Sequence, residues 1–205
     1  DELKRRQVGD IILPQRFDKS RMLRVHDADY LQFLETCWLD WQAAGYKGEA
    51  IASCAPSRRM TRNVPPREID GRIGYYCLAA ETSINGGTWE AAYLAADVAL
   101  TGADLISAGN KSAFSLCRPP GHHAAKDMFG GYCFINNAAV AAQAMLDDGA
   151  TSTETLRGAA ALLELLVPPL AILRTLLAQM GTIRSCMEFQ HQTSMTGING
   201  MINSS

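Results

Sequence analysis

The sequence lacks the excess of positive charge that nucleic-acid-binding domains carry. Its 205 residues hold 19 lysines and arginines against 21 aspartates and glutamates, and the formal net charge is −2. A domain that binds phosphate chains is usually strongly basic. The composition therefore predicts no direct nucleic-acid partner.

Closely spaced cysteines are also missing. The 6 cysteines are scattered, and no two have the C-x-x-C spacing of zinc and redox motifs. No secretory signal is visible, so we expect reduced thiols in a cytoplasmic protein. The chain begins at Asp1 rather than methionine, and we expect that residues precede it.

An uninterrupted apolar stretch long enough for a membrane span is absent too. Residues 159–180 are rich in leucine and alanine, but Pro168 and Pro169 interrupt them, and Glu164 and Arg174 add charge. Two short amphipathic helices are predicted there rather than a membrane span. Residues 184–205 are polar and predict an unstructured tail.

Two adjacent histidines, His122 and His123, are the most informative residues present. They follow an apolar run, residues 113–117, which Pro119, Pro120 and Gly121 end. Such a run predicts a buried strand leading into a loop. In open α/β sheets, ligands bind at the carboxyl ends of strands, so both rings are placed to face a substrate.

The histidine pair has three readings. The rings could act as general acid and base, or bind a metal, although adjacent zinc ligands are awkward. They could also merely satisfy backbone carbonyls in a turn. Gly130 and Gly131, followed by the aromatic-rich run 132–134, indicate unusual backbone angles or close approach by a ligand. This conjunction favours a functional site.

The predicted elements alternate between helix and strand. We expect a helix over 29–44 with Asp29 as N-cap, a loop over 48–74, and a helix that Thr88 caps and that runs to about residue 100. A strand over 112–117 and a helix over 136–147, ended by Gly149, follow. This order predicts an α/β fold with a parallel sheet flanked by helices.

Several motifs occur together and in order, and jointly they resemble the zinc-dependent histone deacetylase superfamily, nearest its acetylpolyamine amidohydrolase branch. The likeness covers about residues 18–150. It implies a partial arginase/deacetylase-like fold, with 1–150 as the N-terminal part of the domain and 151–205 as a divergent helical and unstructured tail. The motifs are residues 25–31, 69–76, 87–92, 118–123 and 130–137.

The resemblance also implies an activity, namely zinc-dependent hydrolysis of acetyl-amide bonds in acetylpolyamines or acetyl-lysine. A zinc-bound water would be the nucleophile, with His122 and His123 as the acid–base pair. The carbonyl of Gly131 would accept a hydrogen bond from the substrate amide, and Tyr132 would form a wall of the substrate tunnel. Glu81 and Asp70 are candidates to meet a distal ammonium, although surface carboxylates are most often only solvated.

The zinc ligands that the resemblance implies after residue 150 are not in the sequence. No aspartate occurs from Gly149 to Ser205, and the only histidine there is His191, with Cys186 as its one nearby thiol. We therefore hypothesise that this chain is truncated and does not hydrolyse amides. A fold without its central strands would expose sheet edges and apolar surface.

Two alternatives remain at this stage. The chain could be an inactive remnant that acts as a binding partner, including a homo-oligomer formed through the 55–76 loop. It could also be a metal-independent hydrolase that uses Cys117 or Cys133. The apolar surroundings of both cysteines disfavour the last reading, because buried thiols are usually inert.

Overall fold

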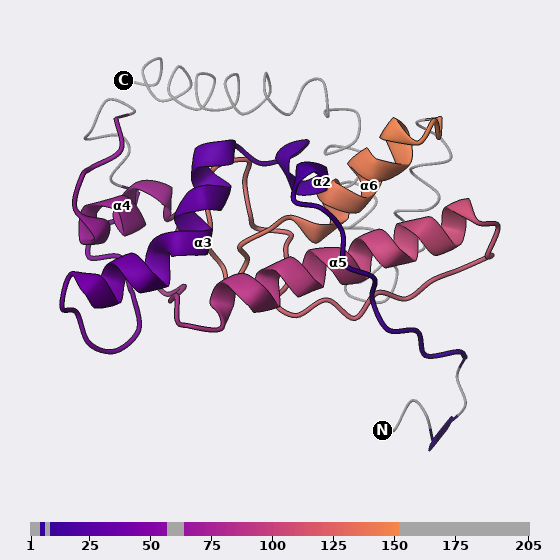
Figure 1. The fold of residues 1–205 in the computed structure, drawn as a ribbon, viewed down its shortest axis with the longest axis horizontal. Coiled ribbons are helices and arrows are strands. Elements are labelled where there is room, and N and C mark those ends of the chain that lie inside the picture. Colours follow the sequence, from indigo (N-terminus) through magenta and orange to yellow (C-terminus); the bar gives the residue numbers. More distant parts are fainter. Residues whose placement is uncertain (1–4, 7–8, 57–63, 152–205) are drawn as a thin grey trace, which may run out of the picture.

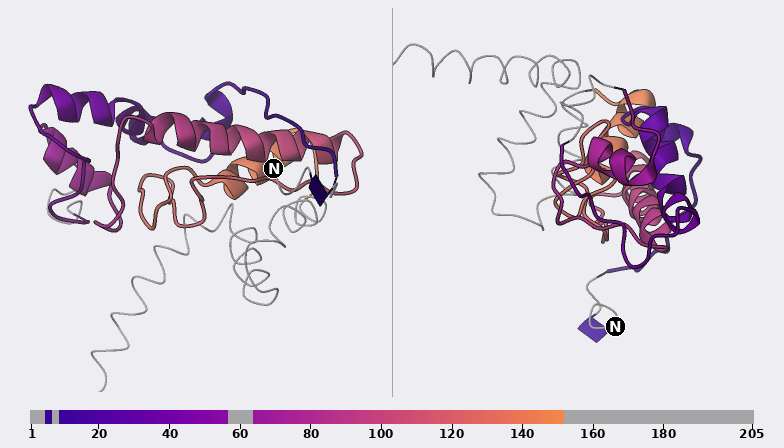
Figure 2. Two further views of the ribbon diagram at one scale, coloured as in Figure 1. Left: turned by 90° about the horizontal axis from the view of Figure 1, so that it is seen from below. Right: turned by 90° about the vertical axis from the view of Figure 1, so that its left-hand side faces the viewer.

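A computed structural model describes residues 5–6, 9–56 and 64–151, with helices labelled as in Figure 1. α5 runs along most of the described part, with α3 and α4 toward its N-terminal end and α6 packed along its C-terminal half (Figures 1 and 2). The predicted helices and tail after residue 151 lie outside the described residues. In chain order the helices are α2 (Ser20–Leu23), α3 (Ala28–Ala43), α4 (Ile69–Tyr76), α5 (Thr88–Ser107) and α6 (Asn137–Asp147).

The helix predicted over 29–44 is confirmed as α3, which is shifted by one residue. Its predicted N-cap was wrong, because Asp27 occupies that position with an extended backbone. Asp29 lies in the first turn, where its carboxylate accepts a hydrogen bond from the Tyr76 hydroxyl at 2.9 Å. α3 buries one apolar side, and Phe33 stacks on Tyr76 with ring centroids 4.5 Å apart. Aromatic packing thus joins α3 to α4.

The loop predicted over 48–74 was wrong in its last part, where α4 begins at Ile69. Ile69, Ile73 and Tyr76 recur at helical spacing and are buried. Burial of this stripe against α3 stabilises a helix in a sequence that contains two glycines.

α5 continues past its predicted end at residue 100 to Ser107. Its last turns pack on α6 through Ala99 and Ala103, which contact Ala141 and Met145. Small side chains allow the two helices to approach closely, and this packing outweighs the low helix propensity of Gly102. Thr88 is the first helical residue and Gly87 the N-cap, so the predicted Thr88 cap was off by one position.

The helix predicted over 136–147 is confirmed as α6. The Asn136 side chain is the N-cap and accepts a hydrogen bond from the N–H of Ala139 at 3.1 Å. Gly149 follows the helix with a φ of +95°, a left-handed conformation that favours glycine. The side-chain amide of Asn137, the first residue of α6, donates to the Pro119 carbonyl at 3.2 Å, so α6 begins next to the segment that carries the histidine pair.

The predicted parallel sheet is not seen in the described ranges, which hold three isolated bridges and no strand. The bridges join Ala50 to Ile84, Cys77 to Phe129, and Gly130 to Cys133. Residues 112–117 lie outside any helix or strand, and no neighbouring segment of the described part pairs with them. A strand exists only beside another strand, so an apolar run cannot form one alone.

The same ranges contain no helix that is long and apolar enough to cross a bilayer.

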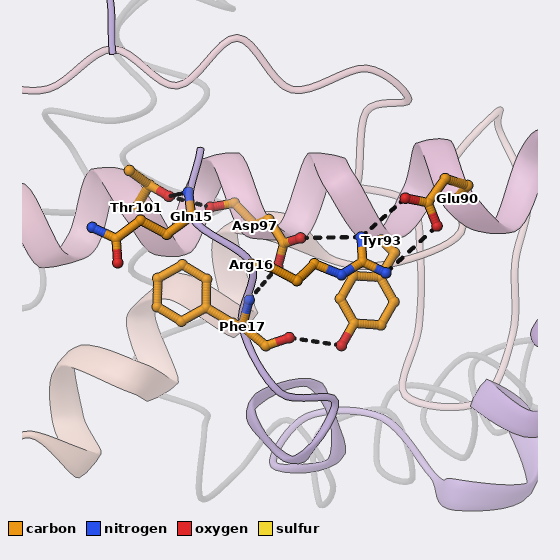
Figure 3. A network of polar contacts seen from close by, with 7 residues as sticks. All are labelled: Gln15, Arg16, Phe17, Glu90, Tyr93, Asp97 and Thr101. Carbon is orange, nitrogen blue, oxygen red and sulfur yellow. Dashed lines mark hydrogen bonds and ion pairs between the residues drawn. The ribbon is translucent and has the colours of Figure 1, made fainter. Parts of the chain in front are cut away.

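The segment that precedes α2 is fastened to α5 around Asp97. The Asp97 carboxylate is buried and accepts hydrogen bonds from the Phe17 N–H at 3.1 Å and the Arg16 guanidinium at 3.4 Å. Arg16 lies 3.7 Å from the centre of the Tyr93 ring, whose hydroxyl donates to the Phe17 carbonyl at 2.8 Å. Burial raises the pKa of Asp97. Figure 3 shows the network, formed by Gln15, Arg16, Phe17, Glu90, Tyr93, Asp97 and Thr101.

Candidate functional site

His122 and His123 lie side by side in the loop that follows residues 112–117. Their ring centroids are 4.3 Å apart with planes tilted by 49°, and both side chains are exposed. Partial burial and the neighbouring His123 lower the pKa of His122. A lowered pKa favours the neutral ring of His122, which can accept a proton. The pair is not enclosed in apolar packing.

Gly131 lies directly against the ring of His123. Its φ is +56°, and a Cβ at this position would lie 2.6 Å from Cδ2 of His123. The predicted unusual backbone is confirmed, and the close approach is made by the histidine. A side chain at residue 131 would push this ring away. The Gly131 carbonyl, predicted to face a substrate amide, accepts a weak hydrogen bond from the Cys133 thiol at 3.4 Å.

Tyr132 stands at the tip of a tight turn next to the histidines. Gly130 and Cys133 exchange two backbone hydrogen bonds of 3.0 Å, and Gly131 and Tyr132 between them both have positive φ. Tyr132 has a φ of +62°, which is uncommon for a residue with a bulky side chain. Its N–H donates to Oγ1 of Thr82 at 2.9 Å, and its side chain is 62% exposed. The turn thus presents an aromatic ring to solvent.

The two predicted acidic residues occupy different places. Glu81 is exposed and directly precedes Thr82, so the chain brings it to the turn that carries Tyr132. Asp70 lies in the first turn of α4, and its carboxylate accepts a hydrogen bond from the N–H of Gly71 at 2.7 Å. Within the described residues, the structure shows no hydrogen bond or ion pair between Asp70 and either histidine. A role for either carboxylate stays a prediction.

His26 is a residue that the sequence analysis placed in a motif but assigned no role. It is 2% exposed, and its Nε2 accepts a hydrogen bond from the N–H of Asn136 at 3.0 Å. Its Nδ1 must then carry the proton, which it donates to the Lys126 carbonyl at 3.1 Å. Burial lowers the pKa of His26 and keeps this neutral tautomer. One ring therefore ties together both ends of the segment that contains the Gly130–Cys133 turn.

Neighbouring contacts reinforce this tie. The hydroxyl of buried Tyr30 donates to the Phe134 carbonyl at 2.6 Å, and Lys126 forms an ion pair with Asp27 at 2.8 Å. Tyr30 lies in the first turn of α3, and Asp27 directly precedes the helix. The sequence signal for this support was the motif at residues 25–31, to which His26 and Tyr30 belong. The sequence did not show which residues His26, Asp27 and Tyr30 would contact.

The thiols close to the site are poor nucleophiles. Burial raises the pKa of Cys117 to about 11 and also raises the pKa of Cys133. A thiol with a high pKa carries little thiolate near pH 7. These values agree with the expectation that neither cysteine acts as a nucleophile. Cys186 lies outside the described residues.

The residues described do not fit a zinc ion. Within ranges 5–6, 9–56 and 64–151, no group of three or more histidine, cysteine, aspartate or glutamate side chains could hold a metal. Catalytic zinc sites take three protein ligands, and the histidine pair alone falls short of this number. The zinc implied by the resemblance therefore has no site among these residues.

Comparison with known proteins identifies the group to which this arrangement belongs. The histone deacetylase domain model matches residues 1–153. The chain belongs to the histone deacetylase family. Among its relatives in that family, an acetylpolyamine amidohydrolase from Mycoplana ramosa is 64% identical over 141 residues, which make up 69% of this chain and 41% of that protein. Acetylpolyamine amidohydrolase 1 from Pseudomonas aeruginosa is 48% identical over 149 residues, 72% of this chain and 43% of that protein.

A solved structure in the family supports the fold. The crystal structure of an acetylpolyamine aminohydrolase from Burkholderia pseudomallei matches with a TM-score of 0.63 at 32% identity, over 71% of this chain and 42% of that one. The described residues thus have the fold of part of a deacetylase domain. The chain spans less than half the length of the curated relatives that it matches.

Proposed function

We propose that this chain carries the histidine pair and the substrate-facing turn of a deacetylase site for acetylpolyamines or acetyl-lysine. The observation that carries the proposal is the pairing of His122 with His123 at 4.3 Å beside the Gly131–Tyr132 turn. Family membership supports amide hydrolysis as the reaction class, and the printed names of the relatives support an acetylated polyamine as substrate.

The proposed roles follow from the positions of the groups. Hydrolysis of an acetyl amide takes a proton from the attacking water and returns a proton to the leaving amine. Two imidazoles in contact can serve these two transfers, and the lowered pKa of His122 leaves that ring free to accept a proton. The Gly131 carbonyl would receive the substrate amide N–H, Tyr132 would cover the acyl-bearing stem, and Glu81 and Asp70 would meet a distant ammonium.

The chain on its own is proposed not to catalyse this reaction. The described residues do not assemble a zinc site, and residues 149–205 contain no aspartate. The second candidate function, an inactive binding partner, rests on the same observation. We assign no catalytic step to a metal, because the residues that would hold it are not among those described.

A fusion protein tests the proposed roles directly. Residues 1–150 of this chain would be joined to the part of the Mycoplana ramosa relative that the chain does not match. We expect the fusion to bind zinc and deacetylate acetylputrescine, whereas the purified 205-residue chain does neither. Zinc content by elemental analysis and amine release by chromatography are the two readouts.

Variants of the fusion separate catalysis from folding. His122→Ala and His123→Ala are each expected to lower turnover by about a hundredfold or more, the usual contribution of a positioned acid or base. Leu39→Ala, at an exposed position of α3, is the control and should leave turnover unchanged. The proposal fails if both histidine variants keep full turnover, or if the unfused chain itself binds stoichiometric zinc and turns over substrate.

A further inference from the structure

Tyr132 has a backbone conformation that its own side chain disfavours. Its φ is +62°, and it follows Gly131, whose φ is +56°, in the turn between Gly130 and Cys133. A glycine adopts the left-handed region without steric cost, whereas a bulky side chain there is an outlier. Such strain persists only where surrounding contacts enforce it. The conformation of Tyr132 therefore depends on contacts from outside the turn.

Thr82 supplies such a contact through its side chain. Its Oγ1 accepts a hydrogen bond from the Tyr132 N–H at 2.9 Å. Within the described residues, Tyr132 makes no other hydrogen bond. Thr82 is 1% exposed, so the acceptor is buried beneath the turn, while the aromatic ring above it faces solvent. The hydroxyl thus holds the backbone of Tyr132 and leaves its ring free for contact with a ligand.

The segment that carries Thr82 is itself fixed by backbone contacts. The Thr82 N–H donates to the Ala79 carbonyl at 3.3 Å. Two residues later, Ile84 exchanges two backbone hydrogen bonds with Ala50, at 2.8 and 2.9 Å. The hydroxyl is therefore an acceptor at a fixed place, to which the Tyr132 N–H is bound.

The base of the turn is held without the Thr82 side chain. The Leu78 N–H donates to the Phe129 carbonyl at 2.6 Å. A Cβ at Gly130 would lie 2.8 Å from Cβ of Leu78, so the two segments pack closely there. Loss of the Thr82 hydroxyl should therefore free Tyr132 and leave the base of the turn in place.

We propose that Thr82 is a positioning residue for the substrate-facing side of the site. Its hydroxyl keeps Tyr132 in the left-handed conformation, so that the ring stays beside the histidine pair. Glu81 directly precedes Thr82, and the same hydrogen bond limits how far Tyr132 can move from this carboxylate. The consequence for substrate binding rests on the proposed function, whereas the hydrogen bond itself is measured without catalysis.

Amide hydrogen exchange in the full 205-residue chain, followed by NMR, tests the contact. Thr82→Val removes the acceptor and keeps the shape of the side chain, and exchange of the Tyr132 N–H should become about fivefold faster, as for the loss of one hydrogen bond. Thr82→Ser keeps the hydroxyl and should stay within about twofold of the parent rate. Ser83→Ala removes the neighbouring hydroxyl, which binds Glu49, and is the matched control with the parent rate.

A second amide separates a local effect from unfolding. The Ile84 N–H binds the Ala50 carbonyl and does not depend on the Thr82 side chain, so it should keep the parent rate in Thr82→Val. Equal acceleration of Ile84 and Tyr132 would show that the hydroxyl only stabilises the fold, and would overturn the proposal. If Thr82→Val prevents folding, Thr82→Ser and Thr82→Ala repeat the comparison, because these two side chains differ only in the hydroxyl.

The fusion with the Mycoplana ramosa relative measures the effect on substrate. Thr82→Val should raise KM for acetylputrescine about fivefold and lower kcat by less than about twofold, because Tyr132 is proposed to cover the stem rather than the reacting amide. Thr82→Ser should return KM to the parent value. A smaller folded fraction would instead lower the apparent kcat and leave KM unchanged, so this split distinguishes positioning from stability.

The outcomes separate this proposal from the proposed function. Unchanged Tyr132 exchange in Thr82→Val, with an active parent fusion, overturns the proposal and leaves the proposed function standing. Faster exchange with an unchanged KM also overturns the proposal, because substrate binding would then not require a fixed Tyr132. Faster exchange at Tyr132 alone, combined with an inactive parent fusion, confirms the hydrogen bond and overturns the proposed function.

Discussion

The ring of His26 accepts a hydrogen bond from the backbone N–H of Asn136, 110 positions later in the chain, at 3.0 Å. The contact joins the residue just before α3 to the N-cap of α6. Because the other ring nitrogen binds the Lys126 carbonyl, a single side chain fixes both ends of the segment behind the histidine pair. Stability and site geometry are therefore coupled through His26.

Replacing His26 by phenylalanine should destabilise the protein. The Lys126 carbonyl would keep its bond from the Asp27 N–H, but the Asn136 N–H would lose its partner. An unsatisfied buried donor costs about 1–3 kcal/mol, and we expect a loss of this size in urea unfolding. His26→Gln, which retains a donor and an acceptor, should lose less. Equal stability of the phenylalanine variant and the parent would contradict this role.

Stability should also fall as the pH drops below about 6.5, the ordinary pKa of histidine. Burial lowers the pKa of folded His26, so the unfolded chain binds a proton in a range where the folded chain does not. The stabilisation is complete above the unfolded pKa and decreases toward the folded pKa, by at most about 1.4 kcal/mol for each pH unit.

The same measurement on His26→Gln isolates this residue. The carboxylates and His122 titrate in both proteins and cancel in the difference. The gap in unfolding free energy between parent and variant should therefore narrow from pH 7 to pH 5. A gap that is constant over this range would show that the folded state protonates His26 as readily as the unfolded state does.

Gly131→Ala should displace His123 as well as strain the backbone. The left-handed conformation costs an L-residue about 1–2 kcal/mol, and the new methyl group would also overlap the His123 ring. Gly45 has a φ of +84° with open space around it, so Gly45→Ala carries the backbone cost alone. Urea unfolding should show a larger loss for Gly131→Ala, and the NMR signals of His123 should move only in that variant. Identical losses and an unmoved ring would contradict the contact.

Asp97→Ala should release the segment that precedes α2. Without the carboxylate, the Phe17 N–H loses its acceptor and Arg16 keeps only its bonds to Glu90. A hydrogen bond to a charged group contributes about 1.5–3 kcal/mol. Trypsin should then cleave after Arg16 roughly ten times faster or more, since tenfold corresponds to about 1.4 kcal/mol. Asp97→Asn keeps an acceptor for Phe17 and should cleave more slowly than Asp97→Ala. Parent-like cleavage of the alanine variant would show that this network does not hold the segment.

The helices were the most predictable part of the fold. The apolar spacing in α3 and the asparagine cap and terminal glycine of α6 are local signals, and both helices lie within one residue of their predicted bounds. α4 and the last turns of α5 were missed, because their stability comes from packing against α3 and α6 rather than from their own residues. Residues 113–117 were predicted to form a buried strand, but no segment of the described residues pairs with them, and Phe114 and Leu116 are exposed.

The sequence by itself determined the family, the adjacency of His122 and His123, and the need for glycine beside Tyr132, because each depends on neighbouring residues or on a motif order. Only the tertiary structure decided that the His123 ring fills the space at Gly131, that His26 reaches Asn136, and that Phe114 and Leu116 face outward. These contacts join positions far apart in the chain. Such positions meet only when packing of the helices fixes their distance, and no local pattern encodes that distance.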